Sequence, residues 1–203
     1  MAVKLIASDL DGTLLTNKKE LSPRTREALD LAAAQGIYLV PATGRSFESV
    51  PEMIREYPGV EYLITANGGA VYSVSEKKRI YQCLMTPESV EAAIAVRKRE
   101  KMVMEVVVDG VPYAEEAYVR DPIRYLATEY GARYIKATRT PVKDIIEFAA
   151  QHAKELDSIS FVCSHEDRKR LYTSLEKEIP DIYVTSSVPN LMEIGHKDAG
   201  KGK

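Results

Sequence analysis

Length, composition and charge limit what this chain can be. Its 203 residues suit one large domain or two modest ones, and a hydrophobic content of 45% is enough to fill a core. A net charge of -2 and a pI near 6.0 argue against a nucleic-acid partner, and no apolar run is long enough to span a bilayer, so we expect no membrane partner either.

The N-terminus and the cysteines point to the compartment. The first residues reach an acidic motif without the long apolar segment and cleavage site of a signal peptide. Cys83 and Cys163 each lie in an apolar, strand-like run, which favours two buried, reduced thiols over a disulfide or a metal site. We therefore expect a cytoplasmic protein.

The first predicted element is a buried strand at residues 3–10, and two carboxylates stand where it stops. Side chains at i and i+2 of a strand point the same way, so Asp9 and Asp11 are expected to project together from its carboxyl end. Open α/β sheets bind ligands at that edge. Because neighbouring acids repel each other, the pair indicates a divalent metal or an acid/base couple. A polar turn is the weaker alternative, since a turn needs only one Asp.

A helix and further strands follow in alternation, which predicts a parallel sheet covered by helices. Ser22 is the expected N-cap of the helix, and Gly36 is its expected stop. A second strand at residues 37–42 ends in a polar loop. Since successive parallel strands place such loops at one edge, Thr43 and Arg45 are expected near the two acids. A third strand at residues 61–65, a turn at Asn67-Gly68 and an apolar hairpin at residues 70–74 and 79–83 complete this part.

From about residue 84 the pattern changes, and it predicts a separate layer of helices on a mostly antiparallel sheet. The expected elements are a helix at 87–101, strands at 102–109 and 111–115, a helix at 116–130 broken by Pro122, a strand at 133–136, a helix at 141–156, a strand at 158–163, a helix from Ser164 to 178, and strands at 182–186 and 191–194.

Four motifs together resemble the haloacid dehalogenase superfamily of phosphohydrolases, most closely its Cof-like branch of sugar-phosphate and cofactor phosphatases. The motifs are Asp9-Leu10-Asp11-Gly12-Thr13, Ala42-Thr43-Gly44-Arg45, Asn67-Gly68-Gly69 and Lys201-Gly202-Lys203. The resemblance implies an α/β fold in which a Rossmann-like parallel-sheet core, at residues 1–83 and 195–203, carries an inserted α+β cap domain at residues 84–194.

The resemblance also implies a reaction and its residues. Asp9 would be the nucleophile that forms an aspartyl-phosphate, and Asp11 the general acid and base. Mg²⁺ would bind the carboxylate of Asp9 and the backbone carbonyl of Asp11. A small phosphorylated metabolite would be the substrate, with its phosphate bound by Leu10, Thr43, Gly44, Arg45 and Lys201.

The residues alone leave local alternatives open. Thr43 could equally begin a helix as its cap, Arg45 could cap a helix end, and Lys201 could be a solvated residue in a Gly/Lys-rich segment.

One motif of the family has no counterpart in this sequence. The family completes its metal site with a Gly-Asp followed by Asn-Asp after the Lys, and no such pattern occurs here. We therefore expect a truncated chain with weak metal affinity. It would either self-associate through the exposed strand at residues 3–10 or have lost residues beyond Lys203 that once paired there. A phosphomutase of the same superfamily and a non-catalytic fragment are the alternatives to a Mg²⁺-dependent phosphatase.

Overall fold

The computed structural model describes residues 3–202, and the chain divides into two compact units. The first unit comprises the chain up to Gln82 together with the segment from Gly200 onward, and the second runs from Cys83 to Ala199. The predicted boundaries followed residues 83 and 194. The second division falls later in the structure because the last strand extends to His196.

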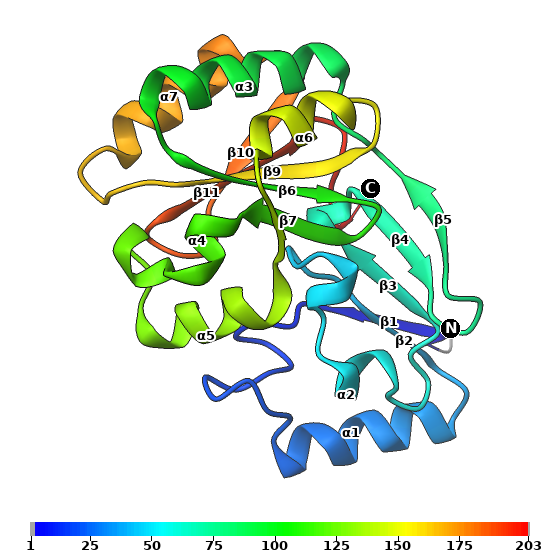
Figure 1. The fold of residues 1–203 in the computed structure, drawn as a ribbon. Helices are drawn as coiled ribbons and strands as arrows, with labels where there is room; N and C mark the ends of the chain where they lie inside the picture. Colours follow the sequence, from blue (N-terminus) through cyan, green and yellow to red (C-terminus); the bar gives the residue numbers. More distant parts are fainter. Residues whose placement is uncertain (1–2, 203) are drawn as a thin grey trace. The chain divides into compact units, whose positions relative to one another are not determined.

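The first unit alternates strands and helices and then forms a hairpin (Figure 1). Its elements are β1 (Leu5–Ser8), α1 (Pro23–Ala34), β2 (Tyr38–Pro41), the 3₁₀ helix η1 (Phe47–Ser49), α2 (Glu52–Arg55), β3 (Tyr62–Thr65), η2 (Ala66–Gly68), β4 (Ala70–Ser73) and β5 (Lys78–Gln82).

The strands of this unit are arranged as an α/β fold requires. β1 pairs in parallel with β2, and isolated parallel bridges join Leu39 to Val60 and Ala42 to Ile64, so β3 runs beside β2. β3, β4 and β5 are antiparallel neighbours. The predicted parallel strands and the predicted hairpin are therefore confirmed.

Helix α1 begins and ends where the sequence predicts. The side chain of Ser22 accepts a hydrogen bond from the amide of Thr25 at 3.1 Å, and Pro23 occupies the first helical position. Gly36 follows the helix with a φ of +70°, a conformation that ends helices.

Strand β1 differs from the prediction, being shorter and more exposed. Leu5 and Ile6 are 51% and 38% exposed, whereas the core of this unit is formed by residues such as Leu10 and Leu63, which are completely buried. Within residues 3–202, β1 has a strand partner on one side only, and this leaves its other edge uncovered.

The second unit is an α+β layer (Figure 1). Its elements are α3 (Pro87–Glu100), β6 (Val103–Val108), β7 (Val111–Glu115), α4 (Glu116–Arg120), η3 (Pro122–Tyr125), α5 (Glu129–Thr138), β8 (Thr140–Val142), α6 (Ile145–Gln151), β9 (Leu156–Val162), α7 (Arg168–Glu178), β10 (Ile182–Thr185) and β11 (Leu191–His196).

Helices cover both faces of a six-stranded sheet in this unit. The strand order is β10-β11-β9-β6-β7-β8, and every pair is antiparallel except β7 with β8. Helices α3, α6 and α7 pack on one face, where Met104 and Phe161 are completely buried (Figure 1). Helices α4 and α5 pack on the other face against Val103 and Val162, because alternate residues of a strand face opposite ways.

Two predictions for this unit are wrong. Residues 133–136, expected as a strand, lie in α5, where the side chain of Thr128 caps the helix and Ala132 and Ile135 share its buried face. The helix expected from residue 141 starts only at Ile145, because Asp144 caps it and the preceding residues form the edge strand β8.

The cysteines also differ from each other. Cys163 is 4% exposed, as expected, and burial raises the pKa of its thiol. Cys83, which follows β5, is only half-buried, so the prediction of two buried thiols is wrong for this residue.

A buried ion pair ties the end of α5 to the sheet. The Arg139 guanidinium donates to Oε2 of Glu105 from Nη2 at 2.7 Å and from Nε at 3.0 Å, and Glu105 is 4% exposed. Burial alone would lower the pKa of Arg139, and the carboxylate of Glu105 outweighs this effect and raises it. Removing one partner would leave a buried charge without compensation.

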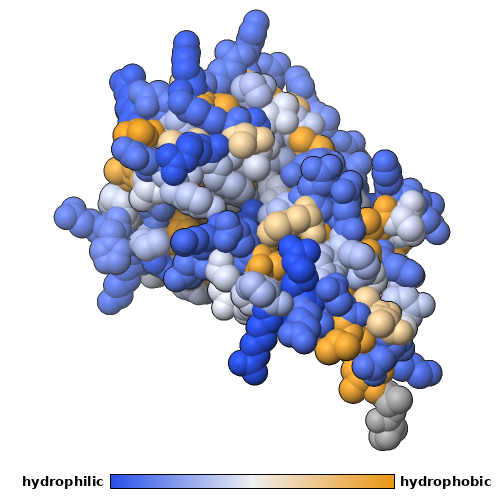
Figure 2. All heavy atoms as spheres, turned by 90° about the horizontal axis from the view of Figure 1, so that it is seen from below, coloured by the Kyte–Doolittle hydropathy of each residue, from blue (hydrophilic) through white to orange (hydrophobic). Residues whose placement is uncertain are grey.

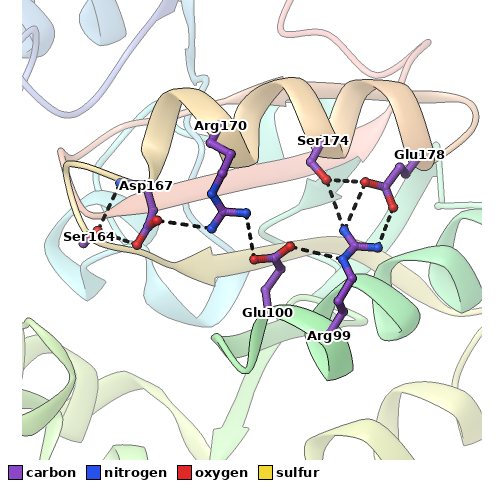
Figure 3. Close-up of polar contacts among 7 residues, drawn as sticks. All are labelled: Arg99, Glu100, Ser164, Asp167, Arg170, Ser174 and Glu178. Carbon is purple, nitrogen blue, oxygen red and sulfur yellow. Dashed lines mark hydrogen bonds and ion pairs between the residues drawn. The ribbon is translucent and has the colours of Figure 1, made fainter.

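An exposed charge network links α3 to α7 (Figure 3). Arg99 donates to Glu178 at 2.7 Å, and Arg170 donates to Glu100 at 2.9 Å and to Asp167 at 3.1 Å. Solvent screens such pairs, so the network contributes less to stability than the apolar packing beneath it.

No helix within residues 3–202 combines the length and the hydropathy needed to cross a membrane.

Candidate active site

The loops that follow β1, β2 and β3 lie at one edge of the first unit's sheet. Ser8 and Pro41, the last residues of β1 and β2, are paired, and the carbonyl of Ser8 accepts a hydrogen bond from the amide of Ala42 at 2.8 Å. The amide of Thr43 donates to the carbonyl of Ile64 at 2.9 Å. Parallel strands thus bring the polar segment after β1 beside the polar loop after β2.

A tight turn places the two aspartates beyond the end of β1. Leu10, between them, is completely buried, whereas Asp9 and Asp11 are partly exposed. The amide of Leu15 donates to the carbonyl of Leu10 at 2.8 Å, and Gly12 adopts a φ of +83°. Since the strand ends before Asp9, this turn and the buried Leu10 hold the carboxylates at the sheet edge.

Asp9 is paired with a residue from the far end of the chain. Nζ of Lys201 lies 2.8 Å from Oδ1 of Asp9. The backbone before Lys201 is held by a close approach, because a Cβ added to Gly68 would lie 2.3 Å from the carbonyl carbon of Gly200. The sequence explains Gly68 by its turn alone, and the structure adds this contact as a second requirement for glycine.

Asp11 is held by two cations. Arg45 donates from Nε to Oδ2 at 2.8 Å and from Nη2 to Oδ1 at 2.9 Å, a two-pronged geometry. Nζ of Lys19 lies 2.7 Å from Oδ1 of the same carboxylate. Arg45 also donates to the carbonyl of Ser49 at 3.0 Å, which fixes the guanidinium.

These contacts set the charge of Asp11. The hydrogen bonds from Arg45, and to a smaller extent the contact with Lys19, outweigh the opposing effect of burial and lower its pKa from 3.8 to about 2. Asp11 is therefore a carboxylate near neutral pH, which is the form of a general base. Proton donation by Asp11 requires these cations to move away from it.

Thr43 and Gly44 form the tight part of the second loop. Thr43 is 1% exposed, and its Oγ1 accepts a hydrogen bond from the amide of Arg45 at 3.1 Å, as in a local side-chain turn. A Cβ added to Gly44 would lie 2.9 Å from the side chain of Asn67. The loop can therefore present its backbone amides closely to an anion.

Sequence reasoning missed two parts of this site. Lys19 adopts a φ of +62°, and nothing in the sequence distinguishes it from its neighbour Lys18. Gly200 matters through its contact with a distant glycine, which no local pattern reveals.

The oxygen atoms at this edge are of the kind that Mg²⁺ prefers, although the protein supplies few of them. The Asp9 carboxylate and the Asp11 carbonyl are hard oxygen donors. Within residues 3–202, no cluster of three or more His, Cys, Asp or Glu side chains is arranged to hold a metal ion. A cation bound by Asp9 and this carbonyl would need water or substrate oxygens to complete its six ligands.

Comparisons with known proteins show the family of this chain. A family model described as haloacid dehalogenase-like hydrolase matches residues 6–203. The HMP-PP phosphatase of Klebsiella pneumoniae is 26% identical over 200 residues, which cover 98% of this chain and 69% of that protein. Phosphatase YwpJ of Bacillus subtilis is 24% identical over 222 residues, which cover 99% of this chain and 76% of the relative.

Solved structures share the fold. A structure described as the HAD subclass IIB sugar phosphatase BT4131 superposes with a TM-score of 0.78 at 19% identity, over 98% of this chain and 72% of the other.

Proposed function

Because this chain belongs to the haloacid dehalogenase-like hydrolases, we propose that its Asp9–Asp11 edge hydrolyses the phosphoric monoesters of small metabolites, either sugar phosphates or phosphorylated cofactors. One observation carries the proposal: two carboxylates lie among three cations, Lys19, Arg45 and Lys201. Such an arrangement suits a phosphate dianion, since the cations can stabilise the charge on the transferring oxygens.

The chemistry is assigned to this chain's own residues. A carboxylate oxygen of Asp9 attacks phosphorus, and the bond to the leaving alcohol breaks while Asp11 donates a proton to the alcohol oxygen. Asp11 then takes a proton from the water that attacks the aspartyl-phosphate, and inorganic phosphate leaves. The Thr43 hydroxyl and the amides of Leu10 and Gly44 bind the phosphoryl oxygens together with Arg45 and Lys201.

Enzymes of this family generally use Mg²⁺, and the proposed ligands here are Oδ2 of Asp9 and the carbonyl of Asp11. The cation would supply positive charge against the phosphate oxygens. Lys201 is paired with Oδ1 of Asp9, which separates its role from that of the metal.

The relatives favour hydrolysis of the phosphoric ester over a mutase reaction, in which the phosphoryl group moves from one position of the substrate to another. The names of the curated relatives in K. pneumoniae and B. subtilis are those of phosphatases. A phosphomutase of the same superfamily would require a bisphosphate activator and would yield an isomeric phosphate in place of inorganic phosphate.

The test is release of inorganic phosphate from a panel of phosphorylated sugars and cofactors, with Asp9→Asn as the matched inactive variant. We expect release by the wild type, loss of release in the variant and in chelator, and recovery on addition of Mg²⁺. Equal release by Asp9→Asn would overturn the assignment of the nucleophile. No turnover of any substrate would favour a non-catalytic fragment, and an isomeric product would favour a mutase.

A further inference from the structure

A thiol, an imidazole and a carboxylate meet in the second unit. Sγ of Cys83 lies 3.4 Å from Nδ1 of His196, within hydrogen-bonding distance for sulfur. Oδ2 of Asp198 lies 3.7 Å from the same nitrogen. Cys83 is the first residue of the second unit, and His196 ends its last strand, so the group joins both ends of this unit.

The surroundings of His196 allow it to accept a proton. In the neutral ring, Nδ1 is an acceptor, and the backbone amide of Asp198 donates to it at 3.2 Å. Protonation takes up the single lone pair of Nδ1, so the contact with the Asp198 amide is lost, and the new hydrogen can face the sulfur or the Asp198 carboxylate. Asp198 therefore offers a partner to both forms of the ring.

Cys163 serves as the unreactive thiol against which Cys83 can be compared. Cys163 is 4% exposed, and burial raises the pKa of its thiol, so little thiolate forms. Cys83 is half-buried and has a base within reach, which is the arrangement that activates a sulfur nucleophile.

We propose that Cys83 is a modification site, at which a hydroperoxide oxidises the thiol to a sulfenic acid with His196 as the proton carrier. The thiol gives its proton to Nδ1 of His196, and the sulfur attacks one oxygen of the peroxide. A sulfur–oxygen bond forms as the oxygen–oxygen bond breaks, and the imidazolium returns the proton to the departing hydroxide. One thiol and one hydrogen peroxide thus give one sulfenic acid and one water.

The experiment follows both cysteines in the same 203-residue protein. The protein is exposed to hydrogen peroxide with dimedone, a trap for sulfenic acids, and the adduct on each cysteine is measured by peptide mass spectrometry over time. We expect Cys83 to react about tenfold faster than Cys163 or more, because a positioned base typically contributes about 10² or more to a proton transfer. Equal rates at the two cysteines would overturn the proposal.

Variants separate the imidazole from general accessibility. His196→Gln is expected to slow adduct formation at Cys83 about tenfold, whereas His152→Gln, which alters the exposed pair with Glu155, is expected to leave it unchanged. The Cys163 rate in His196→Gln reports any unfolding, since its burial depends on an intact core. A rate at Cys83 within twofold of wild type in His196→Gln, with Cys163 unchanged, would overturn the role of the imidazole.

A rise in the rate of adduct formation at Cys163 in His196→Gln would indicate that this variant unfolds. In that case a second variant, His196→Asn, is compared with wild type by iodoacetamide labelling, at a temperature where Cys163 stays protected. Slower labelling of Cys83 in the variant supports the proposal, and equal labelling rejects it.

Discussion

At the scale of single residues, each carboxylate of the site is neutralised by specific pairs. Asp9 is paired with Lys201, and Asp11 with Arg45 and Lys19. Each of these cations can exchange a carboxylate oxygen for a phosphate oxygen when an anion binds. In the proposed reaction, the pairs would therefore hold the cations in place before the phosphate arrives.

We expect Lys19 to contribute to catalysis through its contact with Asp11. Lys19→Met removes a charge-assisted contact worth about 1.5 to 3 kcal/mol when well formed, and partial exposure places the expected effect at the low end. We predict a decrease in kcat/KM for phosphate release of about tenfold. Lys18→Met is the matched control, because Lys18 makes its described contact with Thr16 through the backbone. Equal losses in both variants would remove Lys19 from the site.

The pairing of Asp11 predicts how stability depends on pH. Its pKa is about 2 in the folded chain and 3.8 in the unfolded reference, so the unfolded state binds more protons between these values. This contribution is fully present above about pH 4 and is lost as the pH falls toward 2. In Arg45→Gln the folded pKa moves toward 3.8. The ion pair of Asp11 contributes about 1 kcal/mol to the free energy of unfolding after screening, and Arg45→Gln should lack this contribution already at pH 5.

Denaturant unfolding at pH 5 and pH 3 measures this effect. Wild type should lose more stability between the two pH values than Arg45→Gln, and Asp11→Asn should resemble the variant because it lacks the titrating group. The same loss in all three proteins would contradict the assigned ion pair.

At the scale of elements, the glycine contact between η2 and the segment from Gly200 positions Lys201. Gly68→Ala would place a Cβ 2.3 Å from the backbone of Gly200 at a φ of +98°. We predict a loss of about 2 to 3 kcal/mol in the free energy of unfolding, together with reduced phosphate release as Lys201 is displaced.

Gly36→Ala is the control for conformational strain alone. Gly36 also has a positive φ, of +70°, but a Cβ there meets nothing within 4 Å, so about 1 kcal/mol is expected and activity should be kept. Chemical denaturation and phosphate release of both variants check this. Equal effects would show that the contact with Gly200 has no special weight.

Local sequence signals predicted the strands that precede the two aspartates and Thr43, because caps, stops and strand runs there agree with one another. They failed where tertiary packing decides. Residues 133–136 include Tyr134 and Ile135, residue types that are common in strands, yet the cap at Thr128 and the buried Ile135 stabilise a helix. Lys19 and Gly200 could not be predicted, since one depends on a backbone conformation and the other on a contact far along the chain.

At the scale of the whole molecule, the α/β fold predicted from the strand–helix order is confirmed, and solved structures share it. The face shown in Figure 2 is mostly hydrophilic, with hydrophobic side chains interspersed on it. Leu5 in β1 and Val3, which precedes this strand, are 51% and 63% exposed, and no strand within residues 3–202 pairs with the second edge of β1. An apolar strand edge of this kind can pair with another chain.

We predict that the 203-residue chain associates with itself through β1 as its concentration rises. Leu5→Lys should reduce this association, because a charged side chain opposes edge pairing. Leu31→Lys is the matched control, since Leu31 is 59% exposed but lies on α1. Light scattering over a range of concentrations measures the mass, and a wild-type monomer throughout would refute the prediction.

The pairing of Lys201 with Asp9 also orders events during synthesis. These residues are separated by 192 positions, so the ribosome needs on the order of ten to forty seconds between them. Residues 83–199 make up a compact unit of their own, which can fold in that interval and shorten the flexible loop that must close. Among the contacts within residues 3–202, the pair is then one of the last to form, and a nascent chain holds Asp9 without its lysine until translation has passed the second unit.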